Sequence, residues 1–183
     1  MIDLRREQPE DAAAIRETLR SAFSRAAEAD LVDALRDAGA EVLSLVAVEA
    51  PDSGPDEPPG EGAGRVVGYV LLTRVTVTAE GGDQESVLGL APVAVAPGWQ
   101  GQGIGTMLVE AALEQMRGGA DPAVVVLGDP LFYGRFGFEP ARLWGLQYEQ
   151  PGHEEGFMAV ELSAGGLAGI RGVVRFRPEF AGV

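Results

Sequence analysis

Alternating glycines at residues 100–105, QGQGIG, constrain this chain more than any other feature. They follow an apolar run and precede a pattern with apolar residues three or four apart, which predicts a helix. A tight turn needs one glycine or two, so three of them indicate a ligand that approaches the backbone closely. Free amides and the helix dipole at such a helix start favour an anion, typically a phosphate. The apolar residues of the pattern are Ile104, Met107 or Leu108, Ala111 and Met116.

Three kinds of phosphate-binding loop can be compared with this stretch. A Walker loop requires a lysine, and the chain has none, since all fourteen basic residues are arginine. The dinucleotide fingerprint fails because Thr106 and Leu108 occupy the sixth place that glycine or alanine should fill. It also lies in a parallel unit, whereas a predicted hairpin leads into this loop. The spacing that remains is Gln-x-x-Gly-x-Gly, at Gln100, Gly103 and Gly105.

Composition excludes several classes of function. The chain of 183 residues, 46% hydrophobic and 23% charged, has the make-up of one globular domain. It contains no cysteine and a single histidine, which excludes thiolate nucleophiles, disulfides and His-rich metal sites. A net charge of −14 argues against nucleic acid and fits solubility or a cationic partner. We expect no signal peptide, no membrane span and a cytoplasmic location. His153, in QPGHEEG, is expected in a surface turn.

The order of predicted elements indicates an α/β fold with helices on both faces of a mixed sheet. Pro9 opens a helix over 10–23, in which Ile15, Leu19 and Phe23 are expected to form one buried stripe. The proline- and acid-rich stretch 51–64 is expected to be a solvated, mobile loop. The predicted strands are 1–7, 41–50, 65–78, 86–97, 122–128 and 156–163, with a further one at 172–177; the other helices are 28–39 and the one from Ile104, with a short helix or turn at 129–138.

The glycine motif and its surroundings resemble the GNAT superfamily of general-control-related N-acetyltransferases. APVAVAPGWQGQGIG looks like that family's fourth strand and pyrophosphate loop. VLGDPLFYGRFGFEPA looks like its fifth strand and next helix, with Tyr-x-x-x-Gly-Phe at Tyr133, Gly137 and Phe138. Gly128–Pro130 and the tail LAGIRGVVRFRPEF are similar to a bacterial subgroup of predicted N-acetyltransferases.

The resemblance implies a fold, a domain layout and an activity. The fold is a mixed, mostly antiparallel sheet flanked by helices and splayed between its fourth and fifth strands. Residues 1–163 would form the acetyltransferase domain, with 164–183 as an extension packed on it. The activity is direct transfer of an acetyl group from acetyl-CoA to an amine of a small molecule or protein, with no cysteine nucleophile and no metal. Homodimers are common in the family.

The resemblance also assigns roles to backbone groups. One amide, that of Val95, would face the thioester carbonyl and stabilise its developing oxyanion. Backbone groups of Val93, Ala94 and Val95 would pair with the pantetheine like another strand. The amides that would hold the CoA pyrophosphate are those of Gln100, Gly101, Gln102, Gly103, Ile104, Gly105 and Thr106.

Two residues in these segments each have two interpretations. Tyr133 would act as general acid and protonate the leaving thiolate, or would only pack beside Phe132, Phe136 and Phe138. Pro92 cannot donate to a ladder, so it indicates an edge, a bulge or splayed strands, or else marks the start of a strand.

Other roles stay open among several groups. Glu49 and Glu85 are candidates for the general base by their positions at strand ends, although each also suits a surface charge. Many relatives carry Arg or Lys inside the loop where this chain has Gln100, Gly101 and Gln102, so Arg135 or Arg142 would reach the phosphates instead. The acceptor site would lie near 23–35 and 144–155.

Three alternative functions compete with acetyl transfer. A GNAT fold can sense acyl-CoA without turnover, and retention of Tyr133 argues against that. The same chemistry can use a longer donor such as succinyl-CoA, which would need a buried arginine near the acyl end. A nucleotide-dependent oxidoreductase is disfavoured by the broken fingerprint.

Overall fold

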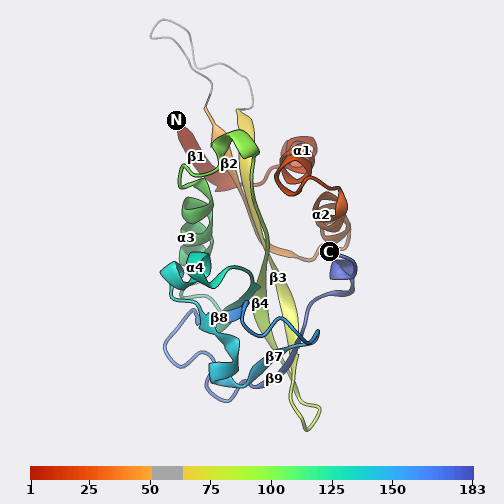
Figure 1. Ribbon diagram of the computed structural model, residues 1–183, viewed down its shortest axis with the longest axis vertical. Coiled ribbons are helices and arrows are strands. Elements are labelled where there is room, and N and C mark those ends of the chain that lie inside the picture. Colours follow the sequence, from red (N-terminus) through yellow and green to blue (C-terminus); the bar gives the residue numbers. More distant parts are fainter. Residues whose placement is uncertain (51–63) are drawn as a thin grey trace, which may run out of the picture.

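A long antiparallel hairpin runs the length of the molecule and organises it (Figure 1). It consists of β3 (Arg65–Thr78) and β4 (Gln84–Val95), paired from Thr78↔Gln84 to Gly68↔Val95. Most of β3 is buried on both faces, which explains its nearly continuous run of Val and Leu. The computed structural model describes residues 1–50 and 64–183, so the loop expected at 51–64 lies outside the described residues except for Gly64.

The other strands extend this hairpin into one mixed sheet. Its order is β1-β2-β3-β4-β5-β8-β6, and β9 pairs with both β3 and β7. Pairing is antiparallel except between β4 and β5 and between β7 and β9. The sheet is therefore mostly antiparallel, as expected. The bounds of these strands are β1 (Ile2–Arg6), β2 (Glu41–Glu49), β5 (Ala123–Leu127), β6 (Glu139–Pro140), β7 (Leu146–Tyr148), β8 (Phe157–Glu161) and β9 (Gly172–Arg175).

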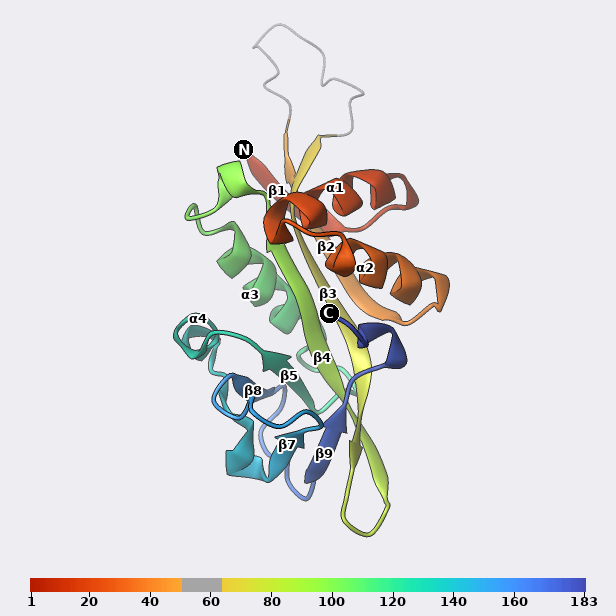
Figure 2. The same ribbon diagram turned by 45° about the vertical axis from the view of Figure 1, so that its right-hand side comes forward.

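Helices cover both faces of the sheet (Figures 1 and 2). On one face α1 (Ala12–Phe23) and α2 (Ala27–Asp37) pack on β2, β3 and β4. On the other face lies α3 (Ile104–Met116), packed on β2 to β5. A short α4 (Pro130–Tyr133) follows β5. No helix within the described ranges is both long and apolar enough to span a membrane.

Strands β4 and β5 separate soon after they meet. They pair only at Leu88↔Val124 and Gly89↔Val125, so the later part of β4 has lost β5 as its neighbour. Pro92 lies in this later part, where the register between β3 and β4 shifts. Of its two interpretations, the bulge next to splayed strands is therefore the one observed, because the strand already begins at Gln84.

Short turns complete the fold, and two of the expected details are wrong. Pro9 opens a turn of 3-10 helix at Pro9–Asp11 rather than α1 itself. Phe23 does not join the buried stripe of Ile15 and Leu19, because the helix ends there at left-handed Ser24 and the Phe23 side chain stays 36% exposed. The remaining 3-10 turns are Pro97–Trp99, Gly134–Phe136, Ala141–Trp144 and Pro178–Phe180.

The buried face of α3 also differs from the expected stripe. Ile104 and Leu108 are buried as expected, whereas Met107 is 39% exposed and Ala111 is only partly buried. The core side of the helix continues instead through Val109, Ala112 and Leu113. The sequence pattern does not define one buried face here, because apolar residues occur on most sides of this helix.

The last segment of the chain returns to the centre of the molecule. β9 pairs with Thr76–Thr78 of β3, beyond Thr73, where the pairing of β3 with β2 stops. Phe176 then lies over Gly89 of β4, where an added Cβ would come within 2.7 Å of the ring. The chain finishes beside α2 (Figure 2). It thus forms part of the surface between α2 and β4.

Candidate active site

The glycine loop presents free amides at the start of α3. Gly101 and Gly103 have positive φ angles of 73° and 84°, which side-chain-bearing residues rarely adopt. The first bond within the helix runs from Met107 N–H to Gly103 O, 3.0 Å. The amides of Gly103, Ile104, Gly105 and Thr106 therefore have no acceptor within the helix. Together with the positive end of the helix dipole, they form a site for an anion.

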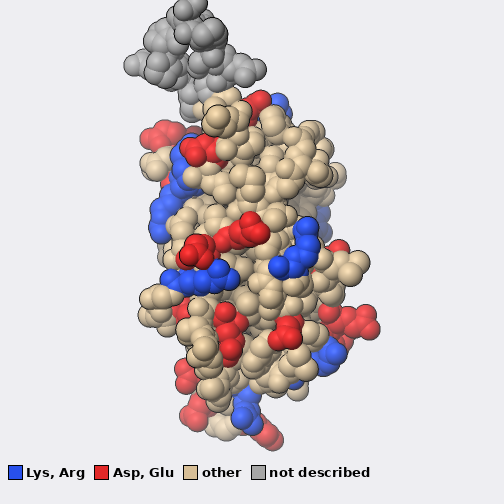
Figure 3. Space-filling model, turned by 90° about the vertical axis from the view of Figure 1, so that its left-hand side faces the viewer, with Lys and Arg blue, Asp and Glu red and all other residues tan. Residues whose placement is uncertain are grey.

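Both glutamines of the loop are exposed, and their side chains also brace it. Gln100 Nε2 donates to Val95 O at 2.9 Å, and Gln102 Nε2 donates to Gly98 O at 3.1 Å. Their side chains fix the turn that carries the amides. On the α3 side of the molecule, basic side chains stand as separate groups among acidic ones (Figure 3). An anion at this loop would thus depend mainly on backbone dipoles.

The end of β4 offers backbone groups toward the splayed side. Val93, Ala94 and Val95 pair with β3 along one edge. Ala96 N–H donates to Val67 O in β3 at 2.8 Å, and amides of successive strand residues point to opposite edges. The amide of Val95 therefore points to the edge that β5 has left. An extended ligand can pair there as an added strand.

Tyr133 is held at this edge by the segment that follows β5. Asp129 Oδ1 accepts from Leu131 N–H at 2.9 Å and caps α4, and Pro130 occupies its first position. Gly128 leaves room for the ring, because a Cβ there would lie 2.3 Å from Tyr133 Cε2. The ring packs edge-on against Phe138, with centroids 5.6 Å apart. Burial raises the pKa of Tyr133 to about 12, so its hydroxyl keeps its proton at neutral pH.

Two cavities meet at Val93 and Tyr133. The first, the donor cavity, opens on the α3 side between the glycine loop and α4. The second, the acceptor cavity, opens toward α2 and has a volume of about 260 Å³. Lining the donor cavity are Val93, Val95, Trp99, Gln100, Gly101, Gly103, Ile104, Gly105, Thr106, Phe132, Tyr133 and Arg135. The acceptor cavity is lined by residues of α1, α2, β4, β5, α4, β7 and the C-terminal segment.

The structure thus brings most of the expected site residues together. Of the residues assigned to acetyl-CoA, the donor cavity lacks only Ala94 and Gln102. Ala94 faces α1 and α2 instead, since successive side chains of a strand alternate. Tyr133 packs against Phe132 and Phe138 and also lines both cavities, so its packing does not remove it from the site, and the general-acid role stays a prediction.

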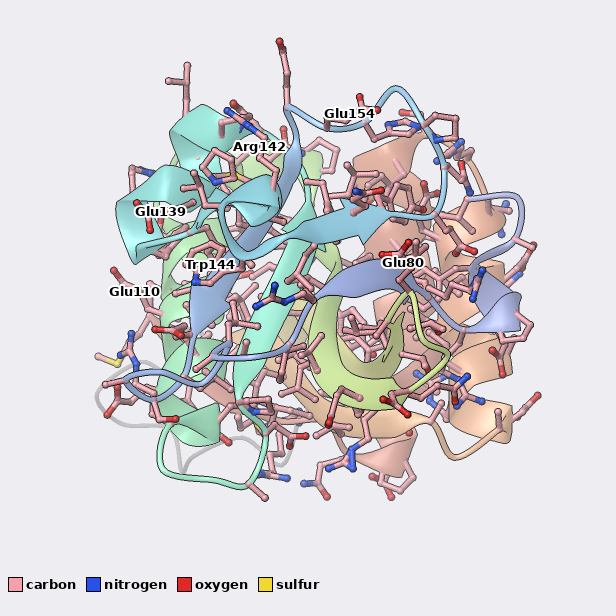
Figure 4. All side chains as sticks on the ribbon, turned by 90° about the horizontal axis from the view of Figure 1, so that it is seen from below. Glu80, Glu110, Glu139, Arg142, Trp144 and Glu154 are labelled. Carbon is pink, nitrogen blue, oxygen red and sulfur yellow. The ribbon has the colours of Figure 1, made fainter. Side chains whose placement is uncertain are left out.

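The two candidate bases lie apart from this meeting point. Glu49 is at the upper end of β2, opposite Ile2 and Arg65. Glu85 pairs with Val77 next to the hairpin whose tip carries Glu80 at the lower end (Figure 4). Neither lines either cavity. The carboxylate that does line the acceptor cavity is that of Glu28, which is only 3% exposed. Glu28 was not among the candidates predicted from the sequence.

Only one of the two candidate arginines reaches the donor cavity. Arg135 lines it, with its Cζ 4.8 Å from the Phe132 ring centroid. Arg135 Nη2 donates to Thr106 Oγ1 at 3.5 Å. Arg142 is on the exposed turn at the lower end, near Trp144 (Figure 4). Among the described residues Arg135 is the one cationic side chain that lines the donor cavity.

Comparison with known proteins identifies the family. Residues 56–140 match the model of the acetyltransferase (GNAT) domain. The uncharacterized N-acetyltransferase YhbS of Escherichia coli is 39% identical over 177 residues, 97% of each chain. This chain belongs to the GNAT family of acetyltransferases. YjhQ of the same organism, also an uncharacterized N-acetyltransferase, is 37% identical over 132 residues, 71% of this chain and 65% of its own.

Solved GNAT structures agree with this fold. The crystal structure of E. coli YhbS in complex with CoA has a TM-score of 0.84 and 37% identity, and the match covers 98% of this chain and 91% of that one. A GNAT acetyltransferase from Brucella melitensis in complex with acetyl-CoA has a TM-score of 0.73 and 32% identity, with 98% of each chain covered. The expected mixed sheet, flanked by helices, is confirmed. Within the described part of the chain, no group of three acidic or histidine side chains could hold a metal ion.

Proposed function

We propose that this GNAT protein transfers the acetyl group of acetyl-CoA directly to an amine. The observation that carries the proposal is the meeting of two cavities, from opposite faces of the sheet, at Val93 and Tyr133. The donor cavity has free amides for the pyrophosphate and an open strand edge for the pantetheine. The amine reaches the thioester through the acceptor cavity. Binding of CoA and of acetyl-CoA by the E. coli and Brucella relatives supports this assignment.

The chemical step needs few protein groups. The neutral amine nitrogen forms a bond to the thioester carbonyl carbon, and the Val95 amide stabilises the oxyanion that develops. Collapse of this intermediate breaks the C–S bond, and the nitrogen releases one proton to water. Tyr133 donates its proton to the departing sulfur and is reprotonated from solvent. No covalent acyl-enzyme forms, which agrees with a chain that has no cysteine.

Calorimetric titration of acetyl-CoA, with NAD and ATP as controls, tests the donor site first. We expect saturable 1:1 binding of acetyl-CoA and none of the controls. Release of free CoA thiol is then followed with a panel of amines. Absence of acetyl-CoA binding at low salt would overturn the whole proposal. Binding without thiol release across the panel would instead favour the sensor function.

Three wider assignments belong to the same proposal. Residues 164–183 are an extension packed on the acetyltransferase domain 1–163, an assignment supported by the pairing of β9 with β3. The enzyme works in the cytoplasm, where acetyl-CoA is available. A homodimer, common in the family, stays a prediction that the sedimentation coefficient would test.

A further inference from the structure

The walls of the acceptor cavity are mostly apolar and aromatic. Three of the large apolar side chains that the fold leaves exposed, Phe23, Leu127 and Val183, line it. The C-terminal segment adds Phe176 and Phe180, whose ring centroids are 5.1 Å apart. Apolar side chains left exposed around one cavity indicate a ligand with an apolar body.

One buried acid interrupts these walls. Glu28 extends from α2 into the cavity lining, with its side chain 4% exposed. Arg25 Nε donates to Glu28 Oε1 at 2.8 Å and to Oε2 at 3.1 Å, and Arg25 Nη2 also donates to Oε1. Arg25 itself is 56% exposed and does not line the cavity. A carboxylate has about four acceptor positions, so Oε2 keeps room for a donor from inside the cavity.

The charges that face the cavity define which ligands fit. Glu28 is its one formally charged lining side chain within the described residues, and no Arg or His faces it. A ligand ammonium would therefore find a charged partner there, whereas a ligand carboxylate would meet Glu28, the tyrosines Tyr133 and Tyr148 and apolar surface, with no cationic side chain among them. A cavity volume of about 260 Å³ suits a small ligand rather than a large one.

We propose that the acceptor is a small primary monoamine on an apolar body, held by a hydrogen bond from its ammonium to Glu28. This inference rests on the proposed acetyl transfer and names its substrate class. The apolar body packs against Phe23, Phe176 and Phe180. The nitrogen, after the ammonium has released one proton to water, lies between Glu28 and the meeting point of the cavities at Tyr133. Polyamines and amino acids are poor acceptors, because their second charge would enter an apolar wall.

A matched set of amines tests the substrate class without any variant. Phenethylamine, L-phenylalanine and spermidine are compared by release of CoA thiol at saturating acetyl-CoA. Phenethylamine and phenylalanine differ by one carboxylate, and spermidine adds charges to an alkyl amine. We expect kcat/KM for phenethylamine to exceed both others by about tenfold to hundredfold, which is the effect of one unpaired charged group. Equal or better turnover of either competitor would overturn the inference.

A substitution of Glu28 tests the anchor. In Glu28→Gln we expect KM for phenethylamine to rise by about tenfold or more, with the Kd of acetyl-CoA unchanged. The matched control is Glu114→Gln, which also breaks an Arg–Glu pair three residues apart, Arg117 with Glu114, but on the exposed surface of α3. Control kinetics should equal those of the parent enzyme. An unchanged KM in Glu28→Gln would overturn the anchor.

The outcomes separate this inference from the proposed function. If acetyl-CoA binds and another class of amine is acetylated, the enzyme assignment stands and the substrate class is wrong. If acetyl-CoA does not bind, the enzyme assignment itself fails. Should Glu28→Gln unfold, Phe23→Ser is the second variant, because Phe23 is partly exposed and can be replaced without opening the core. It should raise KM for phenethylamine and leave the Kd of acetyl-CoA unchanged; an unchanged KM would overturn the apolar site.

Discussion

The two cavities that meet at Tyr133 are built in contrasting ways. The donor cavity has the free backbone groups of one short loop and one strand end, with Arg135 as its charged side chain. The acceptor cavity consists of side chains from α1, α2, β4, β5, α4, β7 and the C-terminal segment, several of which are far apart in the sequence. Backbone amides recognise what all acyl-CoA donors share, whereas a side-chain cavity can change with single substitutions. One fold can thus keep its donor while its acceptor varies.

The sharpest test of this contrast is Tyr133, one of the two residues that line both cavities. Tyr133→Phe should lower kcat by about a hundredfold to ten-thousandfold, as expected for loss of a general acid. The Kd of acetyl-CoA should stay within about twofold, because the ring contacts with Phe132 and Phe138 are kept. Tyr148→Phe, on the acceptor side alone, is the control and should leave kcat near its parent value. Unchanged kcat in Tyr133→Phe would remove Tyr133 from the chemistry.

Gly105 tests the donor cavity apart from folding. Its φ angle is ordinary, and an added Cβ would lie 3.7 Å from Phe132 and Val95, a normal contact. Gly105→Asp should keep the fold, since acids suit the start of a helix, yet weaken acetyl-CoA binding by about a hundredfold or more. Gly105→Ala should unfold at a higher temperature and bind more weakly than the parent. Calorimetry measures the affinity for acetyl-CoA and thermal unfolding measures the stability of each variant. Normal binding in Gly105→Asp would contradict a pyrophosphate site.

The cation of the donor cavity should matter less than its amides. Arg135→Gln should weaken acetyl-CoA binding by about twofold to fivefold, the usual range for an exposed ion pair, and reduce its salt dependence. Arg142→Gln removes the same charge at the far end of the molecule and should have no effect. Equal effects of the two variants would mean that only net charge matters. An effect of Arg135→Gln beyond a hundredfold would show that side chains, rather than backbone, hold the phosphates.

The smallest effect concerns alkaline pH. The pKa of Tyr133 is raised from 10.0 to about 12, so the folded enzyme keeps this proton well above neutrality. Ionisation of Tyr133 should therefore cause no loss of kcat between about pH 8 and pH 10.5. Because the folded pKa is the higher one, this burial stabilises the fold fully below about pH 10, and the stabilisation is lost between about pH 10 and pH 12. An alkaline limb near pH 9 that disappears in Tyr133→Phe would contradict the buried phenol.

The sequence was informative where local chemistry determines the structure. Positive φ angles at Gly101 and Gly103, and the need for space beside Tyr133 at Gly128, follow from backbone requirements that only glycine meets. The start of α3 and the order of strands around it could be predicted for the same reason. Pro92 indicated splayed strands as one of its two interpretations, because proline cannot donate to a ladder, and left a strand start open.

The acceptor side depended on contacts that no local pattern reveals. Phe23 continued the apolar stripe of α1, and only the tertiary fold shows that it borders a cavity. The approach of Phe176 to Gly89 is likewise a contact between distant segments. Glu28 did leave one signal, since it lies three and seven residues before Leu31 and Leu35 on the buried side of α2. A charged residue on an apolar helix stripe is rarely buried without a partner, so it indicates a candidate functional residue.

The early separation of β4 and β5 has a consequence for the order of kinetic events. In the proposed mechanism the donor enters from the α3 side and the acceptor from the α2 side, so neither substrate closes the other's route of exit. The acetylated amine can therefore depart while CoA is still bound, and either substrate can arrive first. A single molecule that joins CoA to an apolar amine through this gap would occupy both routes at once. Such a conjugate would lose its translational freedom once rather than twice, and should inhibit far more strongly than either half.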